Sequence, residues 1–493
     1  MCTNGYGIVR PFVCRKCLKA AQTICLYALA ALVMLVAVRI LSALSLADPG
    51  PSAANQVRPV DLCKPLVIYA QYLFIIFSLN GVQWPVSLSY PLQALAWFWS
   101  SASSNSLGLD CILSRSSIVP VPVQKVVLGL CVPLVILFVL MVVEFLWWVY
   151  KTHSMVSLRG RIRRSSVTVV GVRDRFISLF VCMSFLFLPT WMHTVFSLFT
   201  CVPLDEPAAW PYAANAVGSF WAQDMNERCY APGGYHRSLA LGLGIPLLLL
   251  LCFVLPVGLA AFLQVSKMHG KLGNDTFRRQ YGFLYRTWRE EVCWYEAFVV
   301  VQTMLLVMIG TLGYALGPFY QLLVMATALG FIGVLLLVVK PHNCAEAGAV
   351  CIQSVGVLYA TTFAALSFLP SWQVSGRNIT PPAPYTVTMG VLLLLINVAF
   401  VLCTLFKLLR LVDWAACCRF IRRLGSRAAA CFTVVPALSA RCLRIVCSVH
   451  LPSPDAFHLP HMHAPPCCSV ASSKGRATGQ GLEEGSGDGK SVH

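Results

Sequence analysis

The sequence predicts an all-α fold, a polytopic bundle of about nine transmembrane helices followed by a disordered C-terminal tail. Of the 493 residues, 58% are hydrophobic and 11% are charged, whereas a soluble domain carries roughly 25% charged residues. The chain contains nine apolar runs. The length of each is near or above the roughly 20 residues that a helix needs to cross a membrane. This composition excludes a long solvated enzyme. It also excludes disorder over most of the chain, because disordered segments are poor in apolar residues.

The predicted spans follow one another along the chain, and their ends are marked by polar residues and prolines. Each run is long enough to cross the hydrocarbon core as a helix, since each helical residue adds about 1.5 Å. We expect the spans at 23–46, 65–82, 126–150, 176–199, 239–265, 293–312, 319–339, 345–369 and 385–411. The second span begins at Pro65 in this assignment, which leaves Arg58 and Lys64 in the loop before it.

Basic residues gather in three blocks, at 151–175, 266–292 and 407–493. Loops rich in Lys and Arg stay in the cytosol, so these blocks and the C-terminus are predicted to be cytosolic. Alternation then places three segments on the outer side, at 83–125, 200–238 and 370–384. The basic residues therefore explain the net charge of +18 as an orientation signal. We expect an integral protein of the plasma membrane or an endomembrane, without a nucleic-acid partner.

The basic N-terminal segment 1–22 conflicts with this alternation. It carries Arg10, Arg15, Lys16 and Lys19, which favour the cytosol, yet nine spans place it outside. Eight spans, with a first apolar run that does not cross the membrane, are the alternative. A signal peptide is a further explanation. The bundle itself is predicted to occupy 23–411.

The segment 412–450 after the last span is basic, rich in cysteine and amphipathic at helical spacing. This pattern is typical of a helix that lies on the inner leaflet, and a solvated basic tail is the alternative. Cys417 and Cys418 are candidates for palmitoylation because they are close to the membrane. Residues 451–493 combine proline, glycine, serine and charges, which indicates disorder. Their histidines and cysteines stand among prolines, so no metal site is predicted.

Several motifs occur in a characteristic order between residues 64 and 411. They are YAQYLFIIFSLNGVQWP at 69–85, YGFLYRTWREEVCWYE at 281–296 and VVKPHNCAEAGAV at 338–350. In this order the chain resembles the transient receptor potential-like (TRP C-terminal domain) polytopic membrane proteins of algae, protists and fungi. Relatives often carry a basic pair where this chain has Gln302 and Thr303.

The resemblance implies a TRP-like cation channel or a membrane sensor that is gated by lipid, tension or a ligand. Cations and further copies of the chain are the partners that this interpretation adds to the lipids. Two other classes stay open: a non-conducting receptor or scaffold, and a secondary transporter. We expect no enzyme and no cofactor, because the sequence has no nucleophile elbow, P-loop, HExxH or dinucleotide-binding fingerprint.

Three glutamates lie within or at the ends of predicted spans, and all three are near the cytosolic side. Ionisable residues in membrane spans are costly and mark functional positions. Glu144, Glu296 and Glu346 are therefore the candidate permeation or gating residues. Interfacial positions with local salt bridges are the alternative.

Aromatic and basic residues alternate in the cytosolic segment 278–295. Aromatic rings settle at the level of lipid headgroups, and each arginine near the membrane adds about 1 kcal/mol of attraction to anionic lipid. The predicted headgroup contacts on the inner leaflet are Arg278, Arg279, Arg286, Arg289, Trp288, Trp294 and Tyr295. A plain interfacial anchor without a sensing role is the alternative.

The outer segments contain the residues whose chemistry depends on an oxidising or luminal space. Cys201 and Cys229 bracket one outer loop, and disulfides form in such spaces, so we predict that these two are joined. Asn378 begins an Asn-Ile-Thr sequon on another outer loop and is the candidate for glycosylation.

Overall fold

The computed structural model describes residues 6–10, 13–16, 20–46, 57–79, 81–82, 84–85, 119–158, 171–204, 218–369, 372–374, 377–379 and 383–411. The chain divides into two units, Met1–Trp414 and Ala415–His493, and every described residue belongs to the first. The predicted inner-leaflet helix at 412–450, the predicted disordered tail at 451–493, and Cys417 and Cys418 lie outside the described residues.

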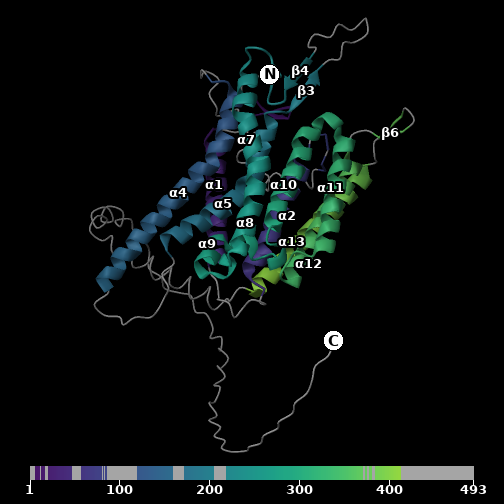
Figure 1. The fold of residues 1–493 in the computed structure, drawn as a ribbon. Coiled ribbons are helices and arrows are strands. Elements are labelled where there is room, and N and C mark those ends of the chain that lie inside the picture. Colours follow the sequence, from purple (N-terminus) through teal and green to yellow (C-terminus); the bar gives the residue numbers. More distant parts are fainter. Residues whose placement is uncertain are drawn as a thin grey trace, which may run out of the picture. The chain divides into compact units, whose positions relative to one another are not determined.

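The described residues contain nine helices that are long and apolar enough to cross a membrane, which confirms the predicted bundle (Figure 1). The helices are α1 (Ala20–Leu46), α2 (Pro59–Phe77), α4 (Val121–Leu158), α5 (Val172–Ser197), the continuous α6–α8 (Tyr235–Met268), α10 (Tyr295–Leu312), α11 (Pro318–Val339), α12 (Ala345–Ala365) and α13 (Ala383–Leu411). A short 3-10 turn, Leu366–Phe368, continues α12.

The start of α2 differs from the prediction. This helix begins at Pro59, where a proline is well tolerated because the N–H it lacks would have no helical partner. The carboxylate of Asp61 accepts the backbone N–H of Arg58 at 3.3 Å and so closes the first turn. Lys64 therefore lies inside the helix, and its expected place in a loop is wrong.

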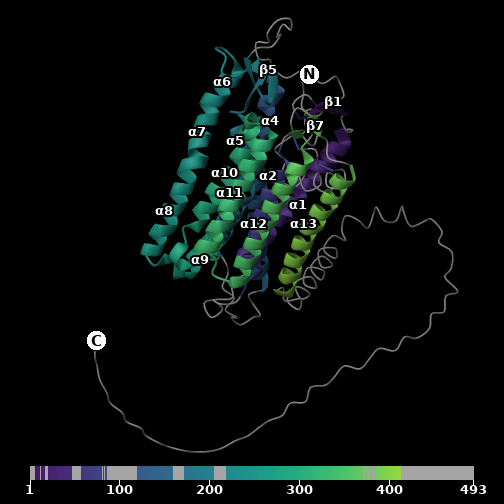
Figure 2. The ribbon, with the colours of Figure 1, turned by 90° about the vertical axis from the view of Figure 1, so that its right-hand side faces the viewer.

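Helix α2 is central to the bundle, and α6–α8 is peripheral. α2 packs against α1, α10, α12 and α13, and 61% of its apolar window is buried, against 6% for α6–α8. Figure 2 shows α6, α7 and α8 along one edge. Two π-helical stretches, Ala240–Gly244 and Leu250–Val254, interrupt this edge helix. The apolar side chains exposed on the edge helix suit contact with lipid, which covers such surfaces in membrane bundles.

The two largest hydrophobic clusters hold most of the helices together. The larger one joins α2, α10, α11, α12 and α13 through side chains such as Tyr72, Met325 and Leu358. The second joins α1, α4 and α5 through side chains such as Val38 and Leu179. The two clusters meet near the centre of the bundle, where α5 packs against α10.

Three small antiparallel sheets stand at one end of the bundle, and the amphipathic helix α9 (Asp275–Tyr285) stands at the other (Figures 1 and 2). The strands are β1 (Tyr6–Arg10), β2 (Val13–Lys16), β3 (Cys201–Leu204), β4 (Gly218–Trp221), β5 (Asp224–Arg228), β6 (Trp372–Val374) and β7 (Arg377–Ile379). They pair as β1–β2, β3–β4–β5 and β6–β7, and the sequence had not predicted them. The N-terminal strands share the end of β3–β5, as alternation over nine spans requires.

Candidate functional site

Lys64 and Glu296 form an ion pair in the interior, although they are 232 residues apart in the sequence. Lys64 lies near the start of α2, and Glu296 lies in the first turn of α10. The Nζ–Oε2 distance is 2.6 Å, and the two side chains are 1% and 2% exposed. Removing a charge from water carries a penalty of several kcal/mol unless a partner compensates it. Each of these two groups therefore depends on the other.

Aromatic rings enclose the ammonium group of Lys64. Its Nζ lies 5.0 Å from the ring centroid of Phe283, 5.1 Å from that of Trp288 and 5.7 Å from that of Phe185. It also donates to the carbonyl oxygen of Phe283 at 3.0 Å. The indole N–H of Trp288 donates to the carboxylate of Glu296 at 2.8 Å. Cation–π attraction strengthens when the cation is desolvated, so these rings stabilise the charged form of the lysine.

The connection between α11 and α12 packs against the same tryptophan. The ring of His342 lies 4.8 Å from the ring of Trp288. Two backbone hydrogen bonds join the segments, from Arg289 N to Pro341 O and from Asn343 N to Thr287 O. Both ring nitrogens of His342 are buried without a partner among the described residues. Burial and the charge of Lys64 lower the pKa of His342 to about 4, so the ring is neutral at neutral pH.

Polar side chains continue along α2 and α10 from this ion pair. Lys64, Gln71 and Ser78 are spaced by seven residues, which places them on one side of α2. On α10, Thr303 follows Glu296 at the same spacing. We refer to this contact between α2, α5 and α10 as the polar seam. Its members are Lys64, Gln71, Ser78, Thr190, His193, Glu296, Thr303 and Thr311.

Gln71 joins α2 to α5 close to Pro189, which lies inside the latter helix. Pro189 has no N–H and cannot bond to the carbonyl oxygen of Phe185 four residues earlier. The Nε2 atom of Gln71 lies 3.3 Å from that oxygen and 3.2 Å from the carbonyl oxygen of Leu186. A carbonyl freed by proline inside a membrane needs a protein partner, because lipid offers none. Gln71 provides this partner.

A cavity of about 30 Å³ lies in the polar seam, at the end that is remote from Lys64. Its walls come from α2, α5 and α10. The polar residues that line it are Gln71, Ser78, Thr190, His193 and Thr311. One layer closer to Lys64, the hydroxyls of Tyr72 and Thr303 are 3.1 Å apart.

A separate hydrogen-bond network ties the other side of α2 to α12 and α13. The hydroxyl of Tyr69 donates to Oδ1 of Asn397 at 2.5 Å. The amide of Asn397 donates to the hydroxyl of Thr361 at 3.1 Å and to the carbonyl of Leu393 at 2.8 Å. Side-chain bonds of this kind between membrane helices contribute roughly 1 kcal/mol each. They hold α2 from the side opposite to α5.

Glu144, on α4, is also buried but belongs to a different cluster. It is 2% exposed and forms ion pairs with Arg39 of α1 and Arg175 of α5. The exposed fractions of those arginine side chains are 41% and 22%. Glu346 is exposed in the first turn of α12. Among the described residues, none of the three predicted glutamates shares a partner with another, so the structure does not gather them into one site.

The predicted lipid-contacting residues divide into an inner and an outer group. Trp288 and Tyr295 are 3% and 2% exposed. They pack inside the bundle, because Trp288 bonds to Glu296 and its ring lies 4.7 Å from that of Tyr295. The expected headgroup contact is therefore wrong for these two rings. Trp294 is 41% exposed.

The predicted arginines lie on and just after α9. Asn274 caps this helix by accepting the N–H of Thr276 at 2.9 Å. The arginine side chains that remain wholly or partly exposed are Arg278, Arg279, Arg286 and Arg289. Arg278 is also 3.2 Å from the carboxylate of Asp275. This end of the bundle therefore keeps a basic surface next to the buried ion pair.

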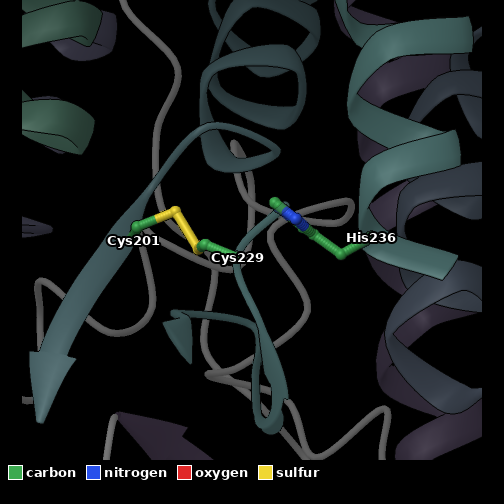
Figure 3. A group of neighbouring side chains, drawn as sticks. All are labelled: Cys201, Cys229 and His236. Carbon is green, nitrogen blue, oxygen red and sulfur yellow. A yellow bond between two sulfur atoms is a disulfide. The ribbon is translucent and has the colours of Figure 1, made fainter. Parts of the chain in front are cut away.

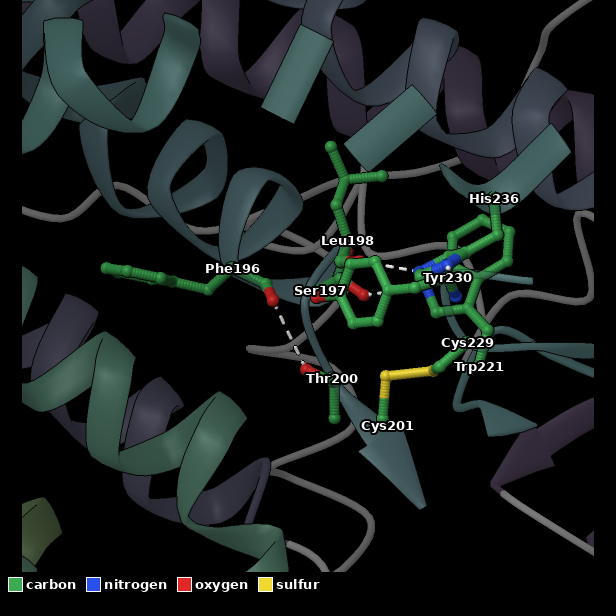
Figure 4. Close-up of a disulfide and its surroundings, with 9 residues drawn as sticks. All are labelled: Phe196, Ser197, Leu198, Thr200, Cys201, Trp221, Cys229, Tyr230 and His236. Carbon is green, nitrogen blue, oxygen red and sulfur yellow. Dashed lines mark hydrogen bonds between the residues drawn. A yellow bond between two sulfur atoms is a disulfide. The ribbon is translucent and has the colours of Figure 1, made fainter. Parts of the chain in front are cut away.

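Cys201 and Cys229 form a disulfide, as the sequence predicted (Figure 3). The imidazole of His236 lies beside it, and the two sulfur atoms and a ring nitrogen are within 4.8 Å of one another. His236 is nevertheless fully hydrogen-bonded (Figure 4): its Nδ1 accepts the N–H of Tyr230 at 3.2 Å, and its Nε2 donates to Leu198 O at 2.9 Å. With both nitrogens and both sulfurs engaged, this group is a structural support for the β3–β5 sheet.

Two further modification candidates stand as predictions. Asn378 lies in β7, where its backbone pairs with Gln373. Figure 2 shows β7 at the same end of the bundle as β5, the strand that precedes Cys229. A sequon at that end suits a luminal or outer side. Cys417 and Cys418 follow α13, beyond the described residues.

No family model, curated protein or solved structure matches this chain. The fold and composition define a multi-pass helical membrane protein with nine candidate spans within its described residues. The resemblance to transient receptor potential-like proteins therefore stays a hypothesis that rests on its motifs.

The sequence did not single out Lys64, Gln71 or His193 as functional residues. One usable signal was the spacing of seven residues between Lys64, Gln71 and Ser78. Charged and polar groups repeated at this spacing along a largely apolar helix indicate a contact with other helices.

Proposed function

We propose that this protein is a TRP-like cation channel or membrane sensor, and that the Lys64–Glu296 ion pair controls the state of its polar seam. The observation that carries this proposal is the burial of a complete ion pair between two membrane helices. Ionisable groups in membrane spans are rare, costly and usually functional. Homo-oligomers, cations as the permeating species and a cytosolic C-terminus belong to the same proposal.

The ion pair supports two distinct states for a simple electrostatic reason. While Lys64 and Glu296 are paired, α2 and α10 are held together at this end. Separation would leave two desolvated charges, each with a penalty of several kcal/mol, unless water enters beside them. Opening of the seam and its hydration are therefore coupled, which is the behaviour expected of a gate.

The basic surface at α9 is the proposed input to this gate. The segment after α9 supplies Trp288, which bonds to Glu296, and α9 itself supplies the Phe283 carbonyl, which bonds to Lys64. Anionic lipid that draws on Arg278, Arg279 and Arg289 would act on the same segment, at about 1 kcal/mol for each arginine. A lipid, tension or ligand signal at this surface therefore reaches the ion pair through two direct contacts.

A planar-bilayer recording of the purified protein tests this proposal. Glu296→Gln removes the charge with little change of shape, and Glu144→Gln is the matched control at a buried carboxylate outside the seam. We expect discrete unitary currents whose open probability changes in Glu296→Gln and is retained in Glu144→Gln. Silence of folded protein across anionic lipids and applied tension would contradict conduction. An equal effect of both substitutions would contradict the assignment to the seam.

A non-conducting receptor is the second candidate. It is favoured by one observation: Glu144 and Glu296 are each neutralised by neighbouring cations, so neither presents a free charge to a passing ion. A receptor would change the fluorescence of a probe on α9 when anionic lipid is added, without current. A secondary transporter would also be silent in the bilayer and would be detected by a flux assay in vesicles.

A further inference from the structure

The cavity in the polar seam is the second unusual feature of α2, α5 and α10. Its volume of about 30 Å³ is enough for about two water molecules, since one water needs roughly 10–15 Å³ by the same measure. Ser78 follows the end of α2, Thr311 is in the last turn of α10, and His193 is in the last turns of α5. Since α5 leads into β3, the cavity lies toward the end of the bundle that carries the sheets.

Three polar groups in this cavity, those of Ser78, Thr311 and Gln71, already donate their hydrogens to protein oxygens. Ser78 donates to the carbonyl oxygen of Ile75, and Thr311 donates to that of Val307, each at 2.8 Å. The amide N–H groups of Gln71 face the carbonyl oxygens of α5. These residues therefore present oxygen lone pairs to the cavity, and a ligand that donates hydrogen bonds fits them best.

His193 lacks a partner among the described residues, although a neutral imidazole carries one donor and one acceptor. The side chain of His193 is partly exposed, and a polar group in a membrane bundle is unfavourable when it has no hydrogen-bond partner. The described lining of the cavity contains no Asp, Glu, Lys or Arg. The nearest charges along α2 and α10 are Lys64 and Glu296, which neutralise each other.

We propose that this cavity is a water site, in which one or two water molecules accept the N–H of His193 and donate to the oxygens of Ser78 and Thr311. A buried water molecule needs two to four polar partners, and the lining of this cavity supplies them. Water also supplies donors to the oxygens of Ser78 and Thr311, which an anion cannot do. The site would hydrate the part of the seam that is remote from Lys64. The water-site proposal does not depend on the proposed conduction, because bound water is detected whether or not ions pass through the protein.

Radiolytic labelling of the purified protein tests this site. X-rays generate hydroxyl radicals from water in place, so a side chain beside bound water is oxidised faster than one without it. His236 is the internal control, because it is 0% exposed and both of its ring nitrogens are bonded to protein. We expect mass spectrometry to show oxidation of His193 that is several-fold faster than that of His236. Equal rates would overturn the proposal.

A variant then tests which atoms hold the water. Ser78→Ala with Thr311→Val removes two acceptor oxygens and leaves His193 unchanged. In this double variant, the oxidation rate of His193 should fall toward that of His236. Thr311→Val alone, which keeps the side-chain shape, should lower the oxidation rate of His193 by part of that amount. Thr388→Val is the control, because Thr388 makes the same type of bond, to Pro384 on α13. An unchanged His193 rate in the seam variants, or an equal fall in the control, would overturn the assigned site.

Discussion

The polar seam and the Glu144 cluster each contain a buried glutamate, and they differ in the burial of its partners. Glu296 and Glu144 are both 2% exposed. Lys64, the partner of Glu296, is 1% exposed, whereas Arg39 and Arg175, the partners of Glu144, are 41% and 22% exposed. A partner that reaches the surface can be solvated when its glutamate is lost. A partner that is enclosed by protein cannot be solvated in this way.

The exposed fraction of a buried glutamate therefore does not by itself indicate its role. The two ion pairs have similar chemistry, but only the pair in the seam leaves an uncompensated interior charge when one member is removed. The seam pair also contacts segments from α5 and from the region of α9. It therefore connects more parts of the bundle, and we expect its loss to have the larger effects.

Lys64→Met should produce the largest effect, because it leaves Glu296 buried and unpaired. Breaking a buried ion pair lowers the free energy of unfolding by about 3–5 kcal/mol. Thermal unfolding of the purified protein in detergent measures this loss. The double variant Lys64→Met with Glu296→Gln should recover much of it, since no interior charge remains. A double variant as unstable as the single one would contradict the role of the pair.

Gln71→Leu should have the next largest effect in the seam. It leaves the carbonyl oxygens of Phe185 and Leu186 without the amide donor, at about 1–3 kcal/mol for an unsatisfied buried group. The same unfolding assay measures the change. Gln264→Leu on the exposed surface of α8 is the matched control and should be nearly neutral. Equal losses of unfolding free energy in the two variants would contradict a stabilising role of Gln71 in the seam.

The pH dependence of stability should distinguish the two regions through His342, which contacts the seam at Trp288. Its pKa falls from 6.5 to about 4 on folding, so between these values the unfolded chain binds more protons than the folded one. The free energy of unfolding should therefore decrease as the pH is lowered through this window, by at most about 1.4 kcal/mol per pH unit from this group.

His342→Phe keeps an aromatic contact with Trp288 and removes the titrating group. Unfolding should be measured between pH 7 and about 4 for both proteins. The variant should show a shallower loss of stability than the wild type on acidification. Lys64 is the charged group that lowers the pKa of this ring, so the same comparison in Lys64→Met shows how much of the pH dependence comes from the lysine charge. Identical slopes in the wild type and in His342→Phe would contradict the burial of a neutral histidine.

Glu144→Gln should have the smallest effect. Its arginine partners are partly exposed, and ion pairs with solvated partners contribute about 1 kcal/mol or less. Unfolding of Glu144→Gln should therefore differ little from that of the wild type, and much less than that of Glu296→Gln. If Glu144→Gln proved as destabilising as Glu296→Gln, the exposure of the partner side chains would not determine the cost of losing the glutamate.

The sequence predicted the features that depend on neighbouring residues. Apolar runs predicted nine helices because each span is a local property of about 20 residues. The bracketing of one loop predicted the bond between Cys201 and Cys229. The position of Lys64 was wrong because Pro59 begins α2 earlier than the apolar run does.

The burial of Trp288 and Tyr295, which the sequence did not predict, depends on distant parts of the chain. The aromatic and basic composition of the surrounding segment predicted that Trp288 and Tyr295 lie at the membrane interface. They are buried because segments far away in sequence, around Lys64 and His342, pack against Trp288. Pairing across such separations leaves no periodic pattern in the sequence. The small sheets at the other end were missed for a different reason: their strands have only three to five residues each, which is too short for a clear alternating pattern.

In the proposed mechanism, Lys64 and Glu296 act as one unit in the opening of the seam. A double-mutant cycle on open probability in planar bilayers tests it directly, with Lys64→Met, Glu296→Gln and the double variant recorded under the same lipid and voltage. Each single change should alter the open probability, and the double variant should resemble the singles instead of showing the sum of their effects. Additive effects, or open probabilities unchanged from the wild type, would contradict the claim.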